Sequence, residues 1–427
     1  MSDIRKICVV ITARPSYSRI KTALQAIQHH PKLELQLVVA GSALLSRYGT
    51  AVDFIEKDGF VVNEKVFMIL EGEDKTAMAK STGLGVMELS NVFYNLKPDI
   101  VITIADRYET IATSIAATYQ NIPLAHLQGG EVTGNIDEKV RHANTKLADI
   151  HLVTNEDALQ RVLKLGEEES SVFNTGCPSI DLASKVLKAP KINFNLKEKY
   201  GGVGAEVDLS KPYIVVMQHP VTTEYKSAKN DITLTLEAID DTGMQTLWFW
   251  PNVDAGADGT SKGIRTYREL HKPKAMRFIK NMEPEDFLKL LYHAKCLVGN
   301  SSVGIRECSF LGVPVVNIGT RQHRRLRGKN VIDVDYNKNH ITEAVLSQKE
   351  EAKVYAEQQR QKRIITIQSM ISYMNNYDIL NSQQVSGWTK NLKNSKNSKK
   401  RTQLRKRKHF RRDSIPDPKE LPSHKKI

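Results

Sequence analysis

The chain has 427 residues, of which 40% are hydrophobic and 26% are charged. These values are typical of a globular protein with two or three domains. No stretch approaches the ~20 consecutive apolar residues of a membrane helix, and the opening MSDIRKICVVIT lacks the apolar region and cleavage site of a signal peptide. We therefore expect a cytoplasmic protein without a membrane partner.

The basic character of the chain is concentrated at its C-terminus. From Lys390 onward there are 15 Lys and Arg against three Asp and Glu, so this segment holds +12 of the net charge of +14. The rest of the chain is thus close to neutral. We predict a disordered tail over 388–427, whose run from Arg405 to Lys408 could contact RNA or anionic lipid without specificity. A selected nucleic-acid partner is not favoured.

The first half alternates strand-like and helix-like segments. Ile7 to Thr12 predicts a buried strand, Ser18 to His29 a helix and Leu33 to Ala40 a second strand. Further strands are expected at Asp99 to Ile104 and at Ile122 to His126. Ile111 to Gln120 is expected to form the helix between these two strands. Continuous apolar strands that alternate with helices indicate a parallel sheet covered on both faces.

The same pattern restarts after about Pro178. Strands are predicted at Tyr213 to Met217, Thr246 to Trp250, Cys296 to Gly299 and Val313 to Ile318. A long helix over Ile341 to Tyr373 is expected to pack outside and to cross back to the first domain.

The predicted fold class is therefore α/β, with two Rossmann-like domains and a ligand cleft at the carboxyl ends of the strands. The domains are expected at 1–180 and 181–376. The connecting region contains Pro190, Gly201, Gly202 and Gly204.

Two polar clusters follow strands of the first half. In Thr12 to Ser18, Arg14 and Ser18 stand at the start of a helix, where free N–H groups favour a phosphate. The segment lacks the glycines of a dinucleotide fingerprint. Asp106 ends another strand beside Arg107, which would stabilise the charged carboxylate as a base or sugar ligand. A surface ion pair for Arg14 and a helix N-cap for Asp106 are the alternatives.

The segment HLQGGEVTGNIDEKVRH places Glu131, Asp137 and Glu138 within eight residues of a glycine-rich loop that leads into a helix. Glycines allow a ligand to approach the backbone. Paired carboxylates suit proton abstraction from carbon and protonation of a leaving oxygen. A solvated acidic loop is the alternative.

Two clusters of the second half suit a diphosphate. His219 follows a strand and could contact a phosphate or act as an acid, although a lone His is more often structural. Ser301 and Ser302 follow another strand and offer hydroxyl and backbone donors, with Glu307 placed for ribose hydroxyls and Arg321 adding a cation. A plain N-cap is the alternative for the two serines.

These motifs resemble the hydrolysing UDP-N-acetylglucosamine 2-epimerases of the bacterial sialic-acid pathway and the epimerase half of the bifunctional animal enzyme. The resemblance covers roughly residues 5 to 375. Its most specific parts are GGEVTGNIDEKVRHA, QHPVTTE, PNVDAG, GNSSVGIRE and GTRQ. It implies a glycosyltransferase-B-type fold, an active site between the two domains, and a homo-oligomer, either dimer or tetramer.

The resemblance, with the clusters above, implies specific residues. The predicted catalytic residues are Asp106, Glu131, Asp137 and His219. The predicted substrate- and UDP-binding residues are Arg14, Ser18, Arg107, Gln128, His219, Asn252, Ser301, Ser302, Glu307 and Arg321.

Two positions depart from the family pattern. Better-known members have Glu where this chain has Gln128, and an amide cannot act as a base, so Glu131 or Asp137 would take that proton transfer. Arg14-Pro15-Ser16 also differs from the usual Arg-Ala-Asp/Glu.

The implied reaction removes the C2 proton as UDP leaves, and water then adds to the resulting 2-acetamidoglycal. The products are N-acetylmannosamine and UDP, which would feed sialic acid biosynthesis. Because the C2–H is weakly acidic, stabilisation of the departing diphosphate is expected to dominate.

The reaction needs no cofactor and no metal. The four cysteines (Cys8, Cys177, Cys296 and Cys308) form no C-x-x-C pair, and we expect them to be small buried apolar residues.

Three alternatives stay open. A non-hydrolysing epimerase would release a UDP-sugar, and a 2-epimerase of a related di-N-acetylated UDP-sugar would act on that substrate instead. A glycosyltransferase of the same architecture would need an acceptor.

Overall fold

The computed structural model describes residues 4–46, 50–71, 74–133, 136–251, 256–348 and 356. The chain divides into two units, Met1–Ser372 and Tyr373–Ile427, and everything described here lies in the first. The predicted tail over 388–427, the predicted site residue Asn252 and most of the helix predicted from Ile341 to Tyr373 therefore lie outside the described residues.

The first half is built on a parallel sheet of seven strands in the order β3-β2-β1-β4-β5-β6-β7. The strands are β1 (Arg5–Ile11), β2 (Leu33–Ala40), β3 (Glu64–Val66), β4 (Ile100–Ile104), β5 (Leu124–Leu127), β6 (Ile150–Val153) and β7 (Val172–Asn174). At its centre Val9 pairs with Leu37 on one side and Ile102 on the other. The central strands β1, β4, β5 and β6 are buried along most of their length, because helices cover both faces of the sheet.

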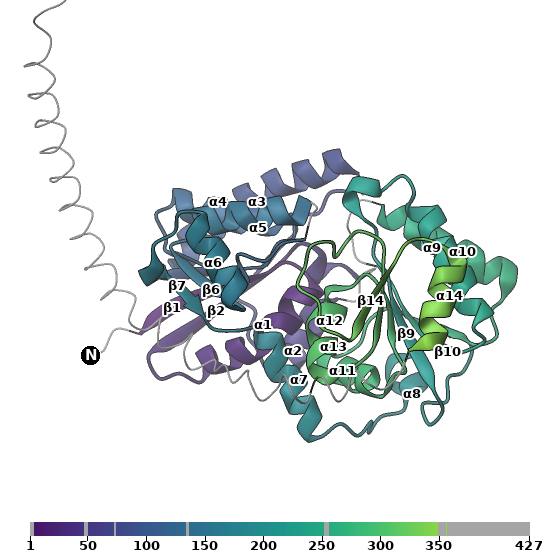
Figure 1. Ribbon diagram of the computed structural model, residues 1–427. Helices are drawn as coiled ribbons and strands as arrows, with labels where there is room; N and C mark the ends of the chain where they lie inside the picture. Colours follow the sequence, from purple (N-terminus) through teal and green to yellow (C-terminus); the bar gives the residue numbers. More distant parts are fainter. Residues whose placement is uncertain are drawn as a thin grey trace, which may run out of the picture. The chain divides into compact units, whose positions relative to one another are not determined.

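Helices cover this sheet. They are α1 (Arg14–Gln28), α2 (Ala51–Lys57), α3 (Lys75–Leu96), α4 (Thr110–Tyr119), α5 (Ile136–Leu147) and α6 (Glu156–Lys164), with short 3-10 turns at Gly41–Leu44 and Glu169–Ser171. Figure 1 shows α3, α4 and α5 side by side over one face, and α3 packs on α4, which packs on α5. Leu89 and Phe93 of α3 insert there against Val10 and Val101 of the sheet.

The second half repeats this plan with the order β14-β13-β12-β9-β10-β11-β8. The strands are β8 (Val203–Gly204), β9 (Tyr213–Met217), β10 (Gln245–Phe249), β11 (Met276–Ile279), β12 (Leu297–Gly299), β13 (Val315–Ile318) and β14 (Val331–Val334). Only the short edge strand β8 runs antiparallel among the pairs of this sheet. Both sheets therefore have the doubly wound order of a Rossmann fold, which confirms the predicted α/β class.

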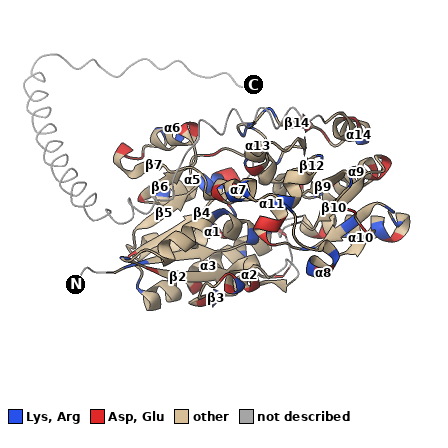
Figure 2. Cartoon of the chain, turned by 90° about the horizontal axis from the view of Figure 1, so that it is seen from below, with Lys and Arg blue, Asp and Glu red and all other residues tan. Residues whose placement is uncertain are grey.

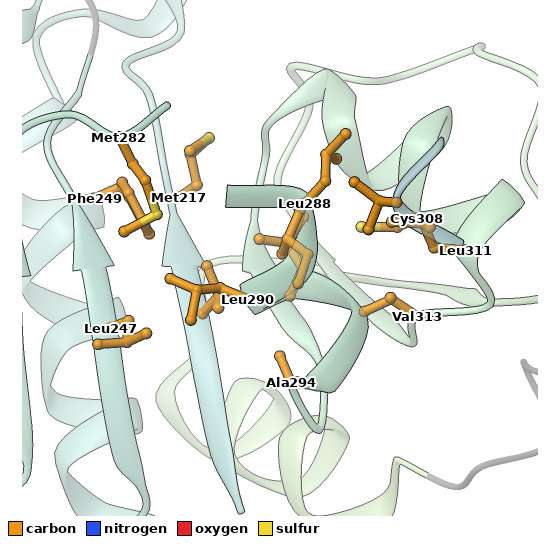
Figure 3. Packing of buried hydrophobic residues seen from close by; sticks show 14 of the residues in the cluster. Met217, Leu247, Phe249, Met282, Leu288, Leu290, Ala294, Cys308, Leu311 and Val313 are labelled. Carbon is orange, nitrogen blue, oxygen red and sulfur yellow. The ribbon is translucent and has the colours of Figure 1, made fainter. Parts of the chain in front are cut away.

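The helices of the second half are α7 (Pro178–Lys188), α8 (Leu196–Tyr200), α9 (Ala228–Asp241), α10 (Ala257–His271), α11 (Pro284–His293), α12 (Ser302–Ile305), α13 (Glu307–Leu311) and α14 (Lys338–Ser347), with a 3-10 turn at Thr222–Glu224. One apolar core lies between α9, α10, α14 and the sheet, around Trp248 and Ile264. A second core contains Leu247, Leu290 and Leu311 on the opposite face (Figure 3).

Helix α7 connects the two halves, because it packs on α1 as well as on α11 and α13. Helix α14 packs on α9, β13 and β14. The predicted domain boundary near residue 180 falls inside α7 and stays a prediction.

No helix in the described part of the chain is long and apolar enough to span a membrane. In Figure 2, basic and acidic residues are interspersed over the described helices and strands. This mixture of basic and acidic residues agrees with the low net charge of the chain before Lys390.

Candidate active site

The candidate site lies where the order of strands reverses in each sheet. β1 and β4 are neighbours in the first sheet, and β9 and β12 are neighbours in the second. At such points the connections leave in opposite directions and open a crevice at the carboxyl ends of the strands. Arg14 and Asp106 follow β1 and β4, while His219 and Ser301 follow β9 and β12.

A pocket of about 1100 Å³, its open mouth included, is lined by residues from both halves. Ten predicted site residues line it: Arg14, Ser18, Asp106, Arg107, Asp137, His219, Ser301, Ser302, Glu307 and Arg321. Gln128 and Glu131 are not among the lining residues of the pocket. Both contact Arg306, which lines it. The fold thus brings together clusters as far apart in the chain as Arg14 and Arg321.

Sequence reasoning missed three arginines of the pocket, Arg19, Arg306 and Arg325. With Arg14, Arg107 and Arg321 they make six arginines, against the three lining carboxylates Asp106, Asp137 and Glu307. Their signal in the sequence was adjacency, since Arg19 follows Ser18, Arg306 precedes Glu307, and Arg325 lies four residues after Arg321. An excess of cations makes the pocket suitable for an anionic ligand such as a diphosphate.

Two guanidinium groups converge on one hydroxyl. Arg19 from the first half and Arg306 from the second each donate to Ser302 Oγ, both at 2.9 Å. Across the cleft, Arg14 Nη1 also donates to Asn281 Oδ1 at 2.9 Å. A phosphate oxygen beside Ser302 would therefore meet cations from both halves.

Asp106 is held by two arginines. Its carboxylate accepts a hydrogen bond from Arg141 and lies 3.8 Å from Arg19 Nη1. Arg107 forms a bidentate pair with Glu109, at 2.8 and 3.2 Å. The turn after β4 thus directs the two side chains to these partners, and the expectation that Arg107 stabilises the charge of Asp106 stays a prediction.

The turn before Asp106 is supported by a buried histidine. Ala105 adopts a positive φ of 63°, which is unfavourable for a residue with a Cβ. Its carbonyl accepts from His126 Nε2 at 2.9 Å, and Thr145 Oγ1 lies 3.1 Å from His126 Nδ1. His126 therefore fixes the turn that aims Asp106 into the pocket.

We expect the free energy of unfolding to decrease as the pH falls from about 6.5 towards 4. Burial lowers the pKa of His126 from 6.5 to about 4, so in this range the unfolded chain takes up a proton that the folded chain refuses. The contribution of neutral His126 to the free energy of unfolding is complete above pH 6.5. His126→Gln, which can still donate to Ala105, should flatten this dependence by up to about 1.4 kcal/mol per pH unit. Guanidinium unfolding at pH 7.5 and at pH 5 measures the change in stability between these two pH values. An equal change in wild type and in His126→Gln would contradict the prediction.

The glycine-rich loop after β5 lies tightly against the fold. Gly130 has a φ of 77°, and a Cβ there would lie 2.3 Å from the carbonyl oxygen of Ala158. The next residue, Glu131, is bound on both carboxylate oxygens, because Oε1 accepts from Thr154 at 2.9 Å and Oε2 accepts from Arg325. Burial alone would raise the pKa of Glu131, but Arg325 and Arg306 outweigh it and lower that pKa to about 2. Glu131 is thus a fixed anion.

Asp137 and Glu138 lie in the first turn of α5, although they were expected in the loop before it. Acidic side chains are favourable there because the free N–H groups of a helix start attract negative charge. Glu138 Oε2 accepts from the backbone N–H of Thr133 at 2.8 Å, while Asp137 lines the pocket. The helix start thereby aims one of its two carboxylates at the ligand space.

In the second half, Asn300 binds the ends of β9 and β12 together. Its side chain accepts from the N–H of His219 and donates to the carbonyl of the same residue, both at 2.8 Å. The carbonyl of Asn300 accepts from Gln322 at 2.9 Å and from Arg321 at 3.4 Å. His219 and Arg321 are therefore positioned by one shared residue.

One wall of the pocket is apolar. Met217, Phe249 and Met282 lie close together in Figure 3, and with Phe287 and Leu288 they face the pocket. Such a wall suits the flat face of a nucleobase beside a charged diphosphate. Among the described residues there is no group of three His, Cys, Asp or Glu that could hold a metal ion.

The fold and the pocket define the class of protein: an α/β enzyme of two Rossmann-like halves, with the glycosyltransferase-B-type architecture. Residues 25–367 match the family described as UDP-N-acetylglucosamine 2-epimerase. The chain belongs to this family, as the resemblance predicted.

Relatives within the family include hydrolysing enzymes. The GDP/UDP-N,N'-diacetylbacillosamine 2-epimerase (hydrolyzing) of Campylobacter jejuni is 35% identical over 335 residues, 78% of this chain and 85% of that protein. The UDP-N-acetylglucosamine 2-epimerase of Neisseria meningitidis serogroup B is 32% identical over 80% of this chain and 87% of its own length.

Solved structures have the same fold. The UDP-GlcNAc 2-epimerase from Neisseria meningitidis bound to UDP-GlcNAc matches with a TM-score of 0.66 at 18% identity, over 82% of this chain and 94% of that one. The enzyme from Methanocaldococcus jannaschii in complex with UDP-GlcNAc and UDP also gives 0.66 at 18% identity, over 83% of this chain and 98% of its own.

Proposed function

We propose that this protein is a hydrolysing UDP-N-acetylglucosamine 2-epimerase that releases N-acetylmannosamine and UDP. The observation that carries the proposal is the pocket between the two strand reversals, where six arginines surround a space that also contains Asp106 and Asp137. The hydrolysing relatives at 34–35% identity support this type of reaction.

The arginines would act on the leaving group. As the C1–O bond breaks, UDP takes the bonding electrons, and the charge on its diphosphate is stabilised by guanidinium groups already in place. Arg14, Arg19 and Arg321 line the space near Ser301 and Ser302 where that diphosphate would bind. Loss of UDP makes the C2 proton acidic enough for removal by a carboxylate.

Asp137 is the carboxylate we assign to the C2 proton. It lines the pocket, whereas Glu131 is bound by Thr154 and Arg325 with its pKa lowered to about 2. A base with so low a pKa holds a proton poorly at neutral pH. The glycal then takes OH from water at C1 and a proton at C2, on the face opposite to the one that lost its proton, with His219 of the pocket as the acid.

Incubation with UDP-N-acetylglucosamine in deuterated water is the direct test. Proton NMR should show free N-acetylmannosamine with deuterium at C2, in equal amount to UDP. Intact UDP-N-acetylmannosamine would instead show a non-hydrolysing epimerase. Turnover only in the presence of an acceptor would show a glycosyltransferase.

A second substrate is favoured by the relatives named for N,N'-diacetylbacillosamine, which are 35% and 34% identical to this chain. The same incubation with the UDP-linked di-N-acetylated sugar compares the two. The larger kcat/KM identifies the substrate, because discrimination between substrates is a ratio of those constants.

We also propose that the enzyme works in the cytoplasm as a homo-oligomer, without a cofactor. A relative in Escherichia coli, 33% identical, is named polysialic acid biosynthesis protein P7. This supports a place for the product in the synthesis of sialic-acid-type sugars. The domain limits at 1–180 and 181–376 and the roles of the remaining site residues belong to the same proposal.

A further inference from the structure

Arg306 is one of the pocket residues that connect the two halves. From the second half its Nη2 donates to Ser302 Oγ at 2.9 Å. Its Nη1 reaches into the first half, where it donates to Gln128 Oε1 at 3.3 Å and lies 3.6 Å from Glu131 Oε2. One guanidinium thus joins the serine loop to the glycine-rich loop.

Arg306 retains a donor for a ligand. Its Nε is buried, makes no hydrogen bond among the described residues and lies 3.9 Å from Glu307 Oε2. An arginine has five N–H donors in a fixed plane, so binding to Ser302 and Gln128 leaves others available. Because Arg306 lines the pocket, a phosphate oxygen could accept from it.

The neighbour of Arg306 across the cleft is held in one orientation. Gln128 is 1% exposed and has a φ of 68°. Its Nε2 donates to Cys177 Sγ at 2.9 Å, and that sulfur lies 3.0 Å from Ser179 Oγ. The amide therefore presents its oxygen to Arg306.

The charge of the side chain at position 128 determines how much of the positive charge of Arg306 remains for a ligand. Glu131 already neutralises much of the charge of Arg325 and Arg306. A carboxylate at position 128 would place a second anion on Arg306 in a buried site, where such a pair interacts strongly. An amide accepts the hydrogen bond without cancelling the charge.

We propose that Arg306 is a further diphosphate-binding residue and that the neutral amide of Gln128 keeps its charge available for the nucleoside diphosphate. This deepens the proposed function and rests on it, since the ligand is the diphosphate of UDP. Residue 128 is then a positioning residue that sets affinity for the anion through Arg306.

UDP binding, measured by titration calorimetry at fixed ionic strength, tests the proposal without turnover. Gln128→Glu and Arg306→Leu should each weaken UDP about tenfold, the effect of losing one charged contact. Gln128→Met, which removes the hydrogen bond but adds no charge, should weaken UDP binding less than Gln128→Glu does. In the double variant, Gln128→Glu should add less than about twofold to Arg306→Leu, because the two act as one unit.

Gln25→Glu serves as the matched control, because it makes the same charge change at an exposed position of α1 and should bind UDP like wild type. Thermal melting confirms that each variant is folded. Equal UDP affinity in wild type and Gln128→Glu, or additive effects in the double variant, would overturn the inference. So would faster turnover in Gln128→Glu with unchanged UDP affinity. Failure of wild type to bind UDP would instead overturn the proposed function.

Discussion

Asp137→Asn is expected to lower kcat on UDP-N-acetylglucosamine by about 10²–10⁴-fold, the usual contribution of a general base. An amide of the same shape cannot accept the C2 proton. Asp137 lines the pocket from the start of α5 but contributes no positive charge to bind the diphosphate. The affinity for UDP should therefore change by less than about threefold. Steady-state kinetics, with deuterium incorporation at C2 followed by NMR, measures both effects.

Glu138→Gln is the control for that variant. Glu138 lies in the same helical turn and accepts from the N–H of Thr133. The amide oxygen of Gln can still accept this hydrogen bond, so turnover should stay close to that of wild type. If Asp137→Asn turned over at the wild-type rate, the base would be another carboxylate, and Asp106→Asn would be the next variant to measure.

Glu131→Ala is expected to lower the free energy of unfolding by about 3–5 kcal/mol, the cost of removing one partner from a buried ion pair. The side chains of Arg325 and Arg306 are 5% and 11% exposed and would lose their shared anion. Because the pKa of Glu131 is about 2 when folded, this contribution is complete above its ordinary value of 4.5 and is lost as the pH falls towards 2. Urea unfolding at pH 7 measures the loss.

Glu269→Ala, at an exposed position of α10, should change stability by less than about 0.5 kcal/mol. If Glu131 were instead the C2 base, Glu131→Gln would abolish deuterium exchange while leaving the unfolding midpoint unchanged. A stability loss that accompanies Glu131→Ala supports its assignment as a fixed anion.

The strands were the most predictable part of the fold. Tyr213 to Met217 and Leu33 to Ala40 were predicted with the bounds that β9 and β2 have. The first is an apolar run of strand length, and the second alternates apolar and polar residues before it becomes continuously apolar. Helix ends were less predictable. Helix α1 begins at Arg14 instead of Ser18, since Pro15 is favourable in the first turn of a helix, where no backbone N–H is needed.

Positions at the ends of strands were also readable from the sequence. Arg14, Asp106, His219 and Ser301 each follow a buried strand, and parallel strands bring their carboxyl ends to one edge of a sheet. The sequence therefore determined that these four residues would lie at the carboxyl edges of their sheets, and the family resemblance adds what the crevice there is proposed to bind.

Only the tertiary structure decided how the charges pair. Asp106 is bound by Arg141, 35 positions away, while the adjacent Arg107 turns to Glu109. Glu131 is bound by Arg325, which lies 194 positions away in the other half of the protein. The hydrophobic pattern along a strand is local, so it can be read from the sequence. An ion pair depends on which side chains the two sheets bring within a few ångströms of each other, and that distance has no counterpart in the order of residues.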